Sequence, residues 1–364
     1  DYPFLRGQTE GHITHYGTFV SPPMRAAAKD GFPQGTILAH YSDTDRMVQQ
    51  RIKPTFMFVQ CTPMDSEGYF TMGFNSLGHA VGIEMAERIV VQVNPRLPRI
   101  LGECNKIHIS KVTAVFEEEA QLYTAPKKEV FDETDYKAAQ LIADRIPNGA
   151  TLQIGVGRIP DAVGNLLDGH KDLGVHTEMF SVSLMNLMKK GVINNSRKSL
   201  KPGKTVFAFA GGQRATQEIY DFVDNNPDIE MNPISWVNDP YVVAELTNFI
   251  SINSAIAVDL TGQVCSESIG TTTFSGPGGQ ADFIRGCQAG PLADSPTFSS
   301  IPPVRKRWNA LLQDQPGAGP RFWCHRLSGR RAVHCDGVRC RGDPLPQHCG
   351  ACPGHDFHRA PPVP

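Results

Sequence analysis

The strongest candidate for chemistry in the sequence is a carboxylate placed between apolar residues. Glu178 lies in the segment VHTEMF (175–180), which has the composition of a short strand that ends nearby. In open α/β sheets, ligands bind beyond the carboxyl ends of the strands, so this carboxylate would lie close to a ligand. The structural alternative is a solvated glutamate at the end of a strand.

A glycine-rich turn precedes this segment. Gly155 and Gly157 follow an apolar run and precede a helical pattern, in which Pro160 suits the first turn. Such turns present backbone N–H groups to the phosphates or carbonyls of a ligand. With Glu178 about 20 residues further on, the pattern also resembles a loose dinucleotide fingerprint, which leaves an NAD-binding oxidoreductase open. A tight connection without a ligand is the structural alternative.

A second glycine-rich segment lies at residues 274–283 (FSGPGGQADF). Gly276, Gly278 and Gly279 surround a proline, and together they expose the backbone of the loop. A loop of this kind can donate N–H groups to an oxyanion or a thioester. The alternative is a hairpin or an ordinary loop.

The elements that must position these groups alternate along the chain. Five short apolar runs predict buried strands, at residues 54–61, 88–93, 151–155, 205–210 and 255–260. Between them, five helical patterns occur at residues 79–86, 135–145, 159–167, 183–190 and 217–225. Alternation of strands and helices predicts parallel sheets covered on both faces. A proline and a charge cluster at residues 123–132 mark the predicted domain boundary.

Composition excludes several classes of protein. With 40% hydrophobic and 20% charged residues, the chain is typical of globular proteins and unlike a disordered or collagenous one. A net charge of −2 leaves no basic surface for nucleic acid or an anionic membrane. We find no apolar run of the roughly 18–20 residues that span a bilayer.

Seven motifs resemble the acetyl-CoA hydrolase/transferase family, in particular its 4-hydroxybutyrate and butyrate CoA-transferase branch. In chain order they are QCTPMDSEGYF (60–70), VQVNPRLPRILGE (91–103), GATLQIGVGRIPDAV (149–163), KDLGVHTEMFS (171–181), VNDP (237–240), INSAIAVDLTGQVCSESIG (252–270) and FSGPGGQADFIRG (274–286). The resemblance implies an α/β fold with two open parallel-sheet domains of the CoA-transferase type, the second of them incomplete. It also implies a cytoplasmic homo-oligomer that binds neither nucleic acid nor membrane.

The resemblance also assigns roles to residues. Glu178 stands at the family's covalent nucleophile, and Gly276, Gly278 and Gly279 stand in its glycine loop at the thioester. We predict that Gly155 and Gly157 also bind the coenzyme. The implied activity is transfer of coenzyme A between an acyl-CoA and a small carboxylic acid of the acetate, butyrate or 4-hydroxybutyrate type. Coenzyme A is then a substrate, and no metal or redox cofactor is expected. An acyl-CoA hydrolase that uses the same glutamate and an inactive fragment are the alternatives.

Three residues depart from the family's pattern. Val182 stands where relatives usually have Asp, Ala257 replaces a usual Glu, and Pro277 occupies a position that is usually Val or Ile. Pro277 has no backbone N–H, so no hydrogen bond can be donated from that position. These changes bear on efficiency and acyl preference more than on the class of reaction.

The last 78 residues have a different composition from the rest. Six of the nine cysteines and 12 of the 28 prolines lie after Gly286, and no glutamate follows Glu267. Residues 336–362, back-translated with permitted codons and read one nucleotide later, give TEYGVAGTPFRNIAERARGMISIAHP, which is similar to the family's C-terminal segment. We therefore predict an N-terminal domain over residues 1–127 that lacks the family's start, a C-terminal domain over 128–286 and an out-of-frame tail over 287–364.

The tail contains residues with the spacing of zinc ligands. His348, Cys349, Cys352 and His355 have the types and intervals found in structural zinc sites. Because this segment is expected to be out of frame, we predict no metal site there.

The frameshift can be tested on the gene. We expect independent reads to show one inserted or deleted base between the codons of Gly286 and about Ile301. An uninterrupted frame that encodes residues 287–364 as printed would contradict this interpretation.

Overall fold

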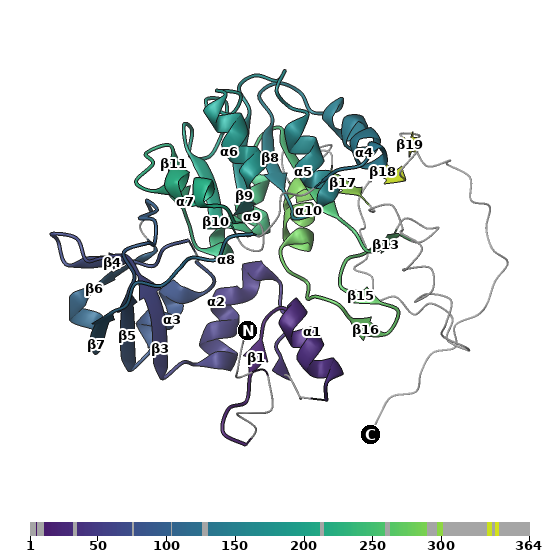
Figure 1. Cartoon of the computed structure of the whole chain (residues 1–364). Helices are drawn as coiled ribbons and strands as arrows, with labels where there is room; N and C mark the ends of the chain where they lie inside the picture. The colour runs from purple at the N-terminus through teal and green to yellow at the C-terminus, as the bar shows by residue number, and fades with distance from the viewer. Residues whose placement is uncertain are drawn as a thin grey trace, which may run out of the picture.

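The structure is a computed structural model that describes residues 5, 11–31, 35–74, 76–102, 104–125, 130–211, 215–258 and 263–289, together with strands at 297–300, 333–336 and 339–341. Its two main parts are each built on a parallel β-sheet, and helices pack around them (Figure 1). The predicted α/β class with two parallel sheets is therefore confirmed. The predicted boundary between residues 127 and 128 falls outside the described residues and stays a prediction.

The smaller part is a three-stranded parallel sheet in the first third of the chain. Its strands, in the order β3-β5-β7, are β3 (Phe56–Cys61), β5 (Arg88–Val93) and β7 (Ala114–Glu117). Val59, Val91 and Val93 are buried on one face, where α3 (His79–Met85) lies nearby. An antiparallel pair, β4 (Tyr69–Thr71) and β6 (Lys106–His108), completes this part.

The larger part is an eight-stranded sheet. Its strands in spatial order are β11 (Ile229–Met231), β10 (Thr205–Ala210), β9 (Gly174–Phe180), β8 (Thr151–Ile154), β12 (Phe249–Ser254), β17 (Thr297–Ser300), β18 (Val333–Asp336) and β19 (Arg339–Arg341). The strands pair in parallel, apart from the antiparallel pair of β18 and β19. β9 therefore has a neighbour on each side.

Two groups of helices cover opposite faces of this sheet. The first group consists of α4 (Glu133–Ala143), α5 (Arg158–Asn165), α6 (Val182–Lys189) and α7 (Gln217–Val223). The second group consists of α8 (Ile234–Val237), α9 (Pro240–Ala244) and α10 (Gln280–Ala289). Along β10, Phe207 packs in the cluster of the first group and Val206 in the cluster of the second, as alternation along a strand requires.

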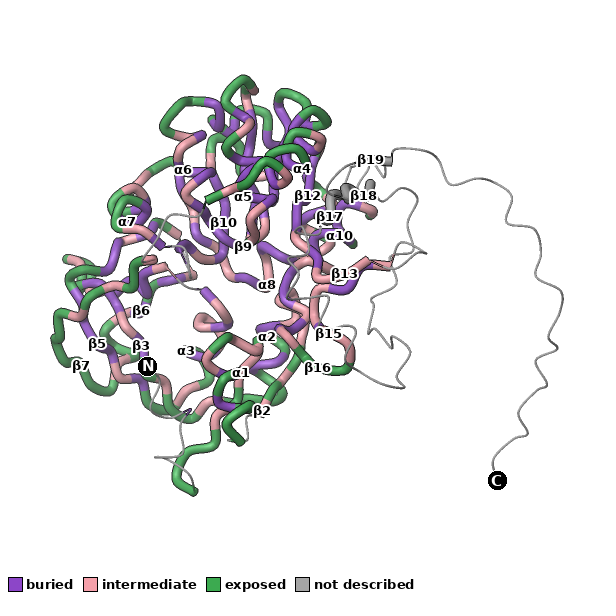
Figure 2. The backbone as a smooth tube through the Cα atoms, turned by 45° about the vertical axis from the view of Figure 1, so that its right-hand side comes forward, coloured by how far each residue is buried: buried purple, intermediate pink, exposed green. Residues whose placement is uncertain are grey.

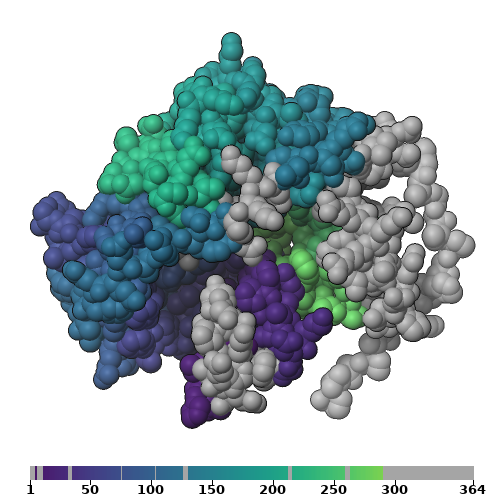
Figure 3. Space-filling model, in the orientation of Figure 1, coloured from purple at the N-terminus to yellow at the C-terminus, as the bar shows by residue number. Residues whose placement is uncertain are grey.

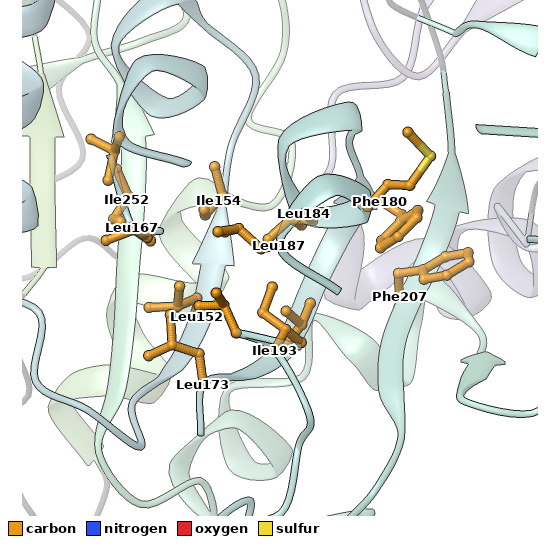
Figure 4. Close-up of a cluster of buried hydrophobic side chains, with 14 of the residues drawn as sticks. Leu152, Ile154, Leu167, Leu173, Phe180, Leu184, Leu187, Ile193, Phe207 and Ile252 are labelled. Carbon is orange, nitrogen blue, oxygen red and sulfur yellow. The ribbon is translucent and has the colours of Figure 1, made fainter. Parts of the chain in front are cut away.

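The cluster under the first group is the largest core of the protein. Figure 4 shows Leu152, Ile154 and Ile252 beside side chains of the covering helices. The rings of Phe180 and Phe207 stack with centroids 5.1 Å apart. These side chains are fully buried, and Figure 2 shows most of β9 and β10 in the colour of buried residues.

On the other face, α9 and α10 pack closely together. A Cβ at Gly286 would lie 2.4 Å from Cβ of Val243, which is closer than real side chains come. Glycine at this position therefore lets the two helices approach. Phe283 of α10 packs in the same cluster with Phe249 of β12.

The remaining described elements are short. They are β1 (Tyr16–Gly17), β2 (Gly35–Thr36), β13 (Ala257–Val258), β14 (Val264–Cys265), β15 (Ser268–Ile269), β16 (Thr272–Thr273), α1 (Pro22–Lys29), α2 (Thr44–Met47), η3 (Tyr41–Asp43), η4 (Val48–Ile52) and η5 (Ile109–Lys111). α1 and η3 come from the start of the chain, yet they lie against the segment after residue 263. Figure 3 shows the two segments in contact, in purple and in green.

One predicted strand was misplaced. The expected runs at residues 88–93 and 205–210 coincide with β5 and β10, whereas the run at 255–260 does not form the buried strand. That strand is β12, and in the described part of the predicted run, residues 255–258, Ala257–Val258 pairs as β13 in a two-stranded sheet. The polar residues Ser251 and Asn253 concealed β12, because they interrupt its apolar pattern.

Candidate active site

Glu178 lies on β9, in the interior of the large sheet. Every other residue of the strand is buried, and Glu178 alone is partly exposed. Met179 and Phe180 follow it before the strand ends, so the carboxylate stands close to the carboxyl edge of the sheet. The structure thus places Glu178 near the predicted ligand edge, but within the strand rather than after it.

Asn238 holds the carboxylate of Glu178. Its side-chain Nδ2 donates a hydrogen bond to Glu178 Oε2 over 2.8 Å, and the asparagine is completely buried. Asn238 ends α8, and the next residue, Asp239, caps the start of α9 through a hydrogen bond from Tyr241 N–H. The amide is therefore fixed at the junction of two helices.

Gly279 brings the backbone of the glycine loop against the same carboxylate. A Cβ on Gly279 would lie 2.0 Å from Glu178 Oε2 and 1.9 Å from Asn238 Nδ2. No side chain fits at this position without moving both groups. α10 begins directly after the loop, and Gly279 O accepts a hydrogen bond from Phe283 N–H at 3.2 Å.

The start of the chain holds the loop from its other side. Tyr41 N–H donates to Gly278 O over 3.1 Å, and a backbone bridge joins His40 to Gly278. Ser42 donates from its backbone N–H and from Oγ to the carboxylate of Asp282 on α10, at 3.0 and 2.8 Å. Residues far apart in the sequence thus assemble around one loop.

Burial controls the charge of this site. Desolvation raises the pKa of Glu178 to about 7; the hydrogen bond from Asn238 opposes this shift, and the charge of Asp282 adds to it. Desolvation likewise raises the pKa of Asp282 to about 6, against the hydrogen bonds from Ser42. Burial, together with the charge of Glu178, also raises the pKa of Tyr41. Near neutral pH, Glu178 therefore passes readily between its two protonation states.

A cavity of about 740 Å³ opens onto Glu178. Its walls are mainly apolar, with Phe19, Phe209, Phe274 and Phe283 among the lining side chains. A cavity of this size suits a small ligand or part of a larger one. It therefore leaves room for a substrate beside the carboxylate.

The structure brings most of the predicted site residues to this cavity. Gly155, Gly276, Gly278 and Gly279 line it together with Glu178. Gly157 does not, since it is absent from the lining and a Cβ there would lie 1.9 Å from Ser254 Oγ. The absence of a side chain at Gly157 therefore lets the turn pack closely against Ser254. Coenzyme binding by Gly157 stays a prediction.

The three departures from the family's pattern have different surroundings. Ala257 and Pro277 line the cavity. Val182 is the first residue of α6 and packs against the large core, where Ser181 caps the helix through a hydrogen bond from Leu184 N–H. Ala257 and Pro277 therefore contribute to the shape of the cavity, whereas Val182 contributes to packing of the core.

Sequence reasoning missed Asn238 as a residue of the site. The signal was present, because the motif VNDP (237–240) places an amide directly before a proline-initiated helix. Arg25 and Tyr41 were missed as well, since nothing in the sequence links residues near the start of the chain to a loop near residue 278.

The described residues form neither a cluster of metal ligands nor a helix that could cross a membrane. Among them, no three His, Cys, Asp or Glu side chains converge as metal ligands, and no helix is long and apolar enough to span a bilayer. His348, Cys349, Cys352 and His355 lie outside the described residues.

Comparison with known proteins decides the family. The N-terminal domain pattern of the acetyl-CoA hydrolase/transferase family matches residues 1–125, and its C-terminal domain pattern matches residues 215–301. The chain belongs to the acetyl-CoA hydrolase/transferase family. The resemblance seen in the motifs is thereby confirmed.

Curated relatives of this chain include several CoA-transferases. It is 38% identical to a succinyl-CoA:acetate/propanoyl-CoA:succinate CoA transferase from Fasciola hepatica, over 84% of this chain and 63% of that protein. It is 39% identical to a 4-hydroxybutyrate coenzyme A transferase from Clostridium kluyveri, over 76% of this chain and 63% of that protein. The chain therefore spans less than two thirds of the length of these relatives.

Solved structures agree with this family. RipA from Yersinia pestis superimposes with a TM-score of 0.77 at 33% identity, over 84% of this chain and 69% of RipA. A 4-hydroxybutyrate CoA-transferase from Porphyromonas gingivalis superimposes with a TM-score of 0.67 at 32% identity, over 81% of this chain and 71% of that one.

The raised pKa of Glu178 predicts a pH-dependent effect on stability. Since its folded-state pKa is raised from 4.5 to about 7, the stabilisation from its proton is complete below pH 4.5 and lost as the pH rises through 7. Glu178→Gln removes the desolvated charge, so it should raise the melting temperature at pH 8 by the equivalent of about 3 kcal/mol. At pH 5 we expect little difference.

The matched control is Glu245→Gln, which changes an exposed glutamate away from the cavity. Melting curves of the control should follow the unsubstituted protein at both pH values. Equal shifts for Glu178→Gln at pH 5 and pH 8 would contradict the raised pKa.

Proposed function

We propose that the protein transfers coenzyme A between an acyl-CoA and a small carboxylic acid through a covalent thioester on Glu178. The observation that carries this proposal is the set of groups that surround the Glu178 carboxylate. A partly exposed carboxylate faces a largely apolar cavity and is held by a buried amide and by a backbone without a side chain. The acids we expect are of the acetate, butyrate or 4-hydroxybutyrate type.

The proposed reaction begins when ionised Glu178 attacks the thioester carbonyl of the acyl-CoA. The carbon–sulfur bond breaks, which leaves a mixed anhydride on Glu178 and free CoA thiolate. The thiolate then attacks the glutamyl carbonyl, so that the first acid leaves as its carboxylate and CoA remains on the enzyme as a thioester. A second carboxylate reverses these steps and departs as the new acyl-CoA.

The residues around Glu178 have roles in this scheme. Asn238 orients the carboxylate through its hydrogen bond to Oε2. The backbone of Gly279 lies against the reacting carboxyl group, so its N–H is the loop donor in this scheme, whereas Pro277 has no N–H to offer. A donor aimed at an oxyanion contributes about 2.7–4 kcal/mol to such reactions. The apolar walls keep water away from the anhydride, which favours transfer over hydrolysis.

The partners of the proposed reaction are an acyl-CoA and a small carboxylate, with coenzyme A as a substrate. The scheme needs no metal or redox cofactor. The homo-oligomeric state and the cytoplasmic location implied by the resemblance remain predictions.

Glu178→Gln tests the covalent step. The amide keeps the shape of the side chain but cannot act as the nucleophile, so turnover should fall by about 10³-fold or more while CoA esters still bind. Mass spectrometry after incubation with acyl-CoA should find CoA on Glu178 in the unsubstituted protein, and borohydride should reduce this residue alone.

Different outcomes separate the alternatives. Acyl-CoA loss that does not depend on added acetate indicates a hydrolase, and stabilisation by NAD but not by a CoA ester indicates the oxidoreductase. Absence of a CoA adduct in the unsubstituted protein indicates an inactive fragment. An adduct on another acid, or full turnover by Glu178→Gln, overturns the proposed mechanism.

Gly279→Ala tests the close approach of the loop. Because the added Cβ would overlap both Glu178 Oε2 and Asn238 Nδ2, the carboxylate must move, and such displacements lower rates by about 10²-fold. Gly169→Ala is the matched control, since a Cβ at Gly169 meets no atom within 4 Å. Steady-state rates should fall for Gly279→Ala alone; equal rates for the two variants would contradict the geometry.

A further inference from the structure

Arg25 extends from α1 into the cavity that contains Glu178. Its Nη1 donates to the carbonyl oxygens of Val20 and Phe274, at 2.7 and 2.5 Å. The guanidinium carbon lies 4.1 Å from the centre of the Phe274 ring. These contacts hold the partly buried guanidinium in one place, next to the glycine loop.

In the described part of the protein, no carboxylate neutralises the charge of Arg25. Among the described residues that line the cavity, Arg25 is the one basic residue and Glu178 the one carboxylic acid, and they form no ion pair with each other. Within the described part of the chain, no carboxylate lies within ion-pair distance of Arg25. Burial alone lowers its pKa, as expected for a cation without an anion beside it.

The start of α1 adds to this positive potential. Pro22, the first residue of the helix, lines the cavity, and the first turn of the helix contains no acidic residue. No carboxylate of the first turn therefore offsets the positive end of the helix dipole, which lies close to Arg25. A cation in a mostly apolar cavity carries a desolvation cost, which an anionic ligand removes.

Arg25 retains donors for such a ligand. The hydrogen bonds described for its side chain use Nη1, so Nη2 and Nε are available to a planar anion. Guanidinium groups bind carboxylate and phosphate oxygens in a bidentate manner, which a lysine cannot reproduce.

We propose that Arg25 and the start of α1 form an anion subsite, which binds a second anionic group of the substrate while the reacting carbonyl lies at Glu178. This inference rests on the proposed function. The anion is either the distal carboxylate of a dicarboxylic acyl group or a phosphate of coenzyme A. Both groups present oxygens that Arg25 can bind, and the experiment below distinguishes the carboxylate from the phosphate.

The experiment compares Arg25→Gln and Arg25→Lys with the unsubstituted protein on matched substrates. Succinyl-CoA and butyryl-CoA differ in a terminal carboxylate, and the corresponding pantetheine thioesters lack the CoA phosphates. If Arg25 binds the carboxylate, kcat/KM of Arg25→Gln should fall about 10–100-fold more for succinyl-CoA than for butyryl-CoA. If Arg25 binds a phosphate, kcat/KM of Arg25→Gln should fall equally for both CoA esters and should not change for either pantetheine ester.

Arg25→Lys should retain part of the kcat/KM that Arg25→Gln loses, because lysine keeps the positive charge but lacks the planar donors. Ser275→Ala is the control for loop anchoring, since Ser275 Oγ donates to Ser266 O over 3.0 Å in the same loop without any charge. Its effect should be equal for all four substrates. An equal loss on all four substrates by Arg25→Gln would overturn the subsite and leave Arg25 a purely structural role.

A binding measurement keeps this test separate from turnover. In the Glu178→Gln protein, succinate or inorganic phosphate should raise the melting temperature, and adding Arg25→Gln should abolish that rise. If Glu178→Gln stays active but this dependence on Arg25 holds, the covalent mechanism fails and the subsite stands. Stabilisation that is the same with and without Arg25 would refute the subsite.

Discussion

The site depends on one close approach, that of a backbone without a side chain to the partly desolvated carboxylate of Glu178. Glu178 Oε2 accepts a hydrogen bond from Asn238 and lies where a Cβ of Gly279 would be. Desolvation of a carboxylate is expensive, so its pKa rises until a neutral form is within reach near pH 7. The packing of the helices onto the sheet brings a strand, a helix junction and a loop together at this point.

Most of the strands predicted from the sequence are present in the sheets, and the misplacement of one of them has a physical cause. The apolar runs of β5 and β10 are continuous, which is typical of strands buried on both faces. β12 carries Ser251 and Asn253 instead, and both are satisfied by hydrogen bonds to Gln153 on the neighbouring strand β8. Burial of polar groups is tolerated when they pair across strands, and a pattern of apolar residues does not reveal such pairs.

The candidate site was predictable only in part. Glu178 and the glycine loop stand out because a carboxylate among apolar residues and a cluster of glycines are locally unusual. Asn238 and Arg25 do not, since their roles arise from contacts across 60 and 249 positions of the sequence. Such contacts depend on how helices pack onto the sheet, and no local pattern encodes that distance. The place of Gly157, by contrast, follows from packing of the turn rather than from the cavity.

The close packing of α9 against α10 has a consequence for how the site can vary. Asn238 precedes α9 and Gly279 precedes α10, so both groups that touch Glu178 stand at the starts of helices joined at Gly286 and Val243. Gly286 lies seven residues after Gly279, or about 10 Å along the helix axis. Gly286 does not line the cavity, yet its close approach to Val243 sets the spacing of the two helices whose starts bring the amide and the loop to the carboxylate.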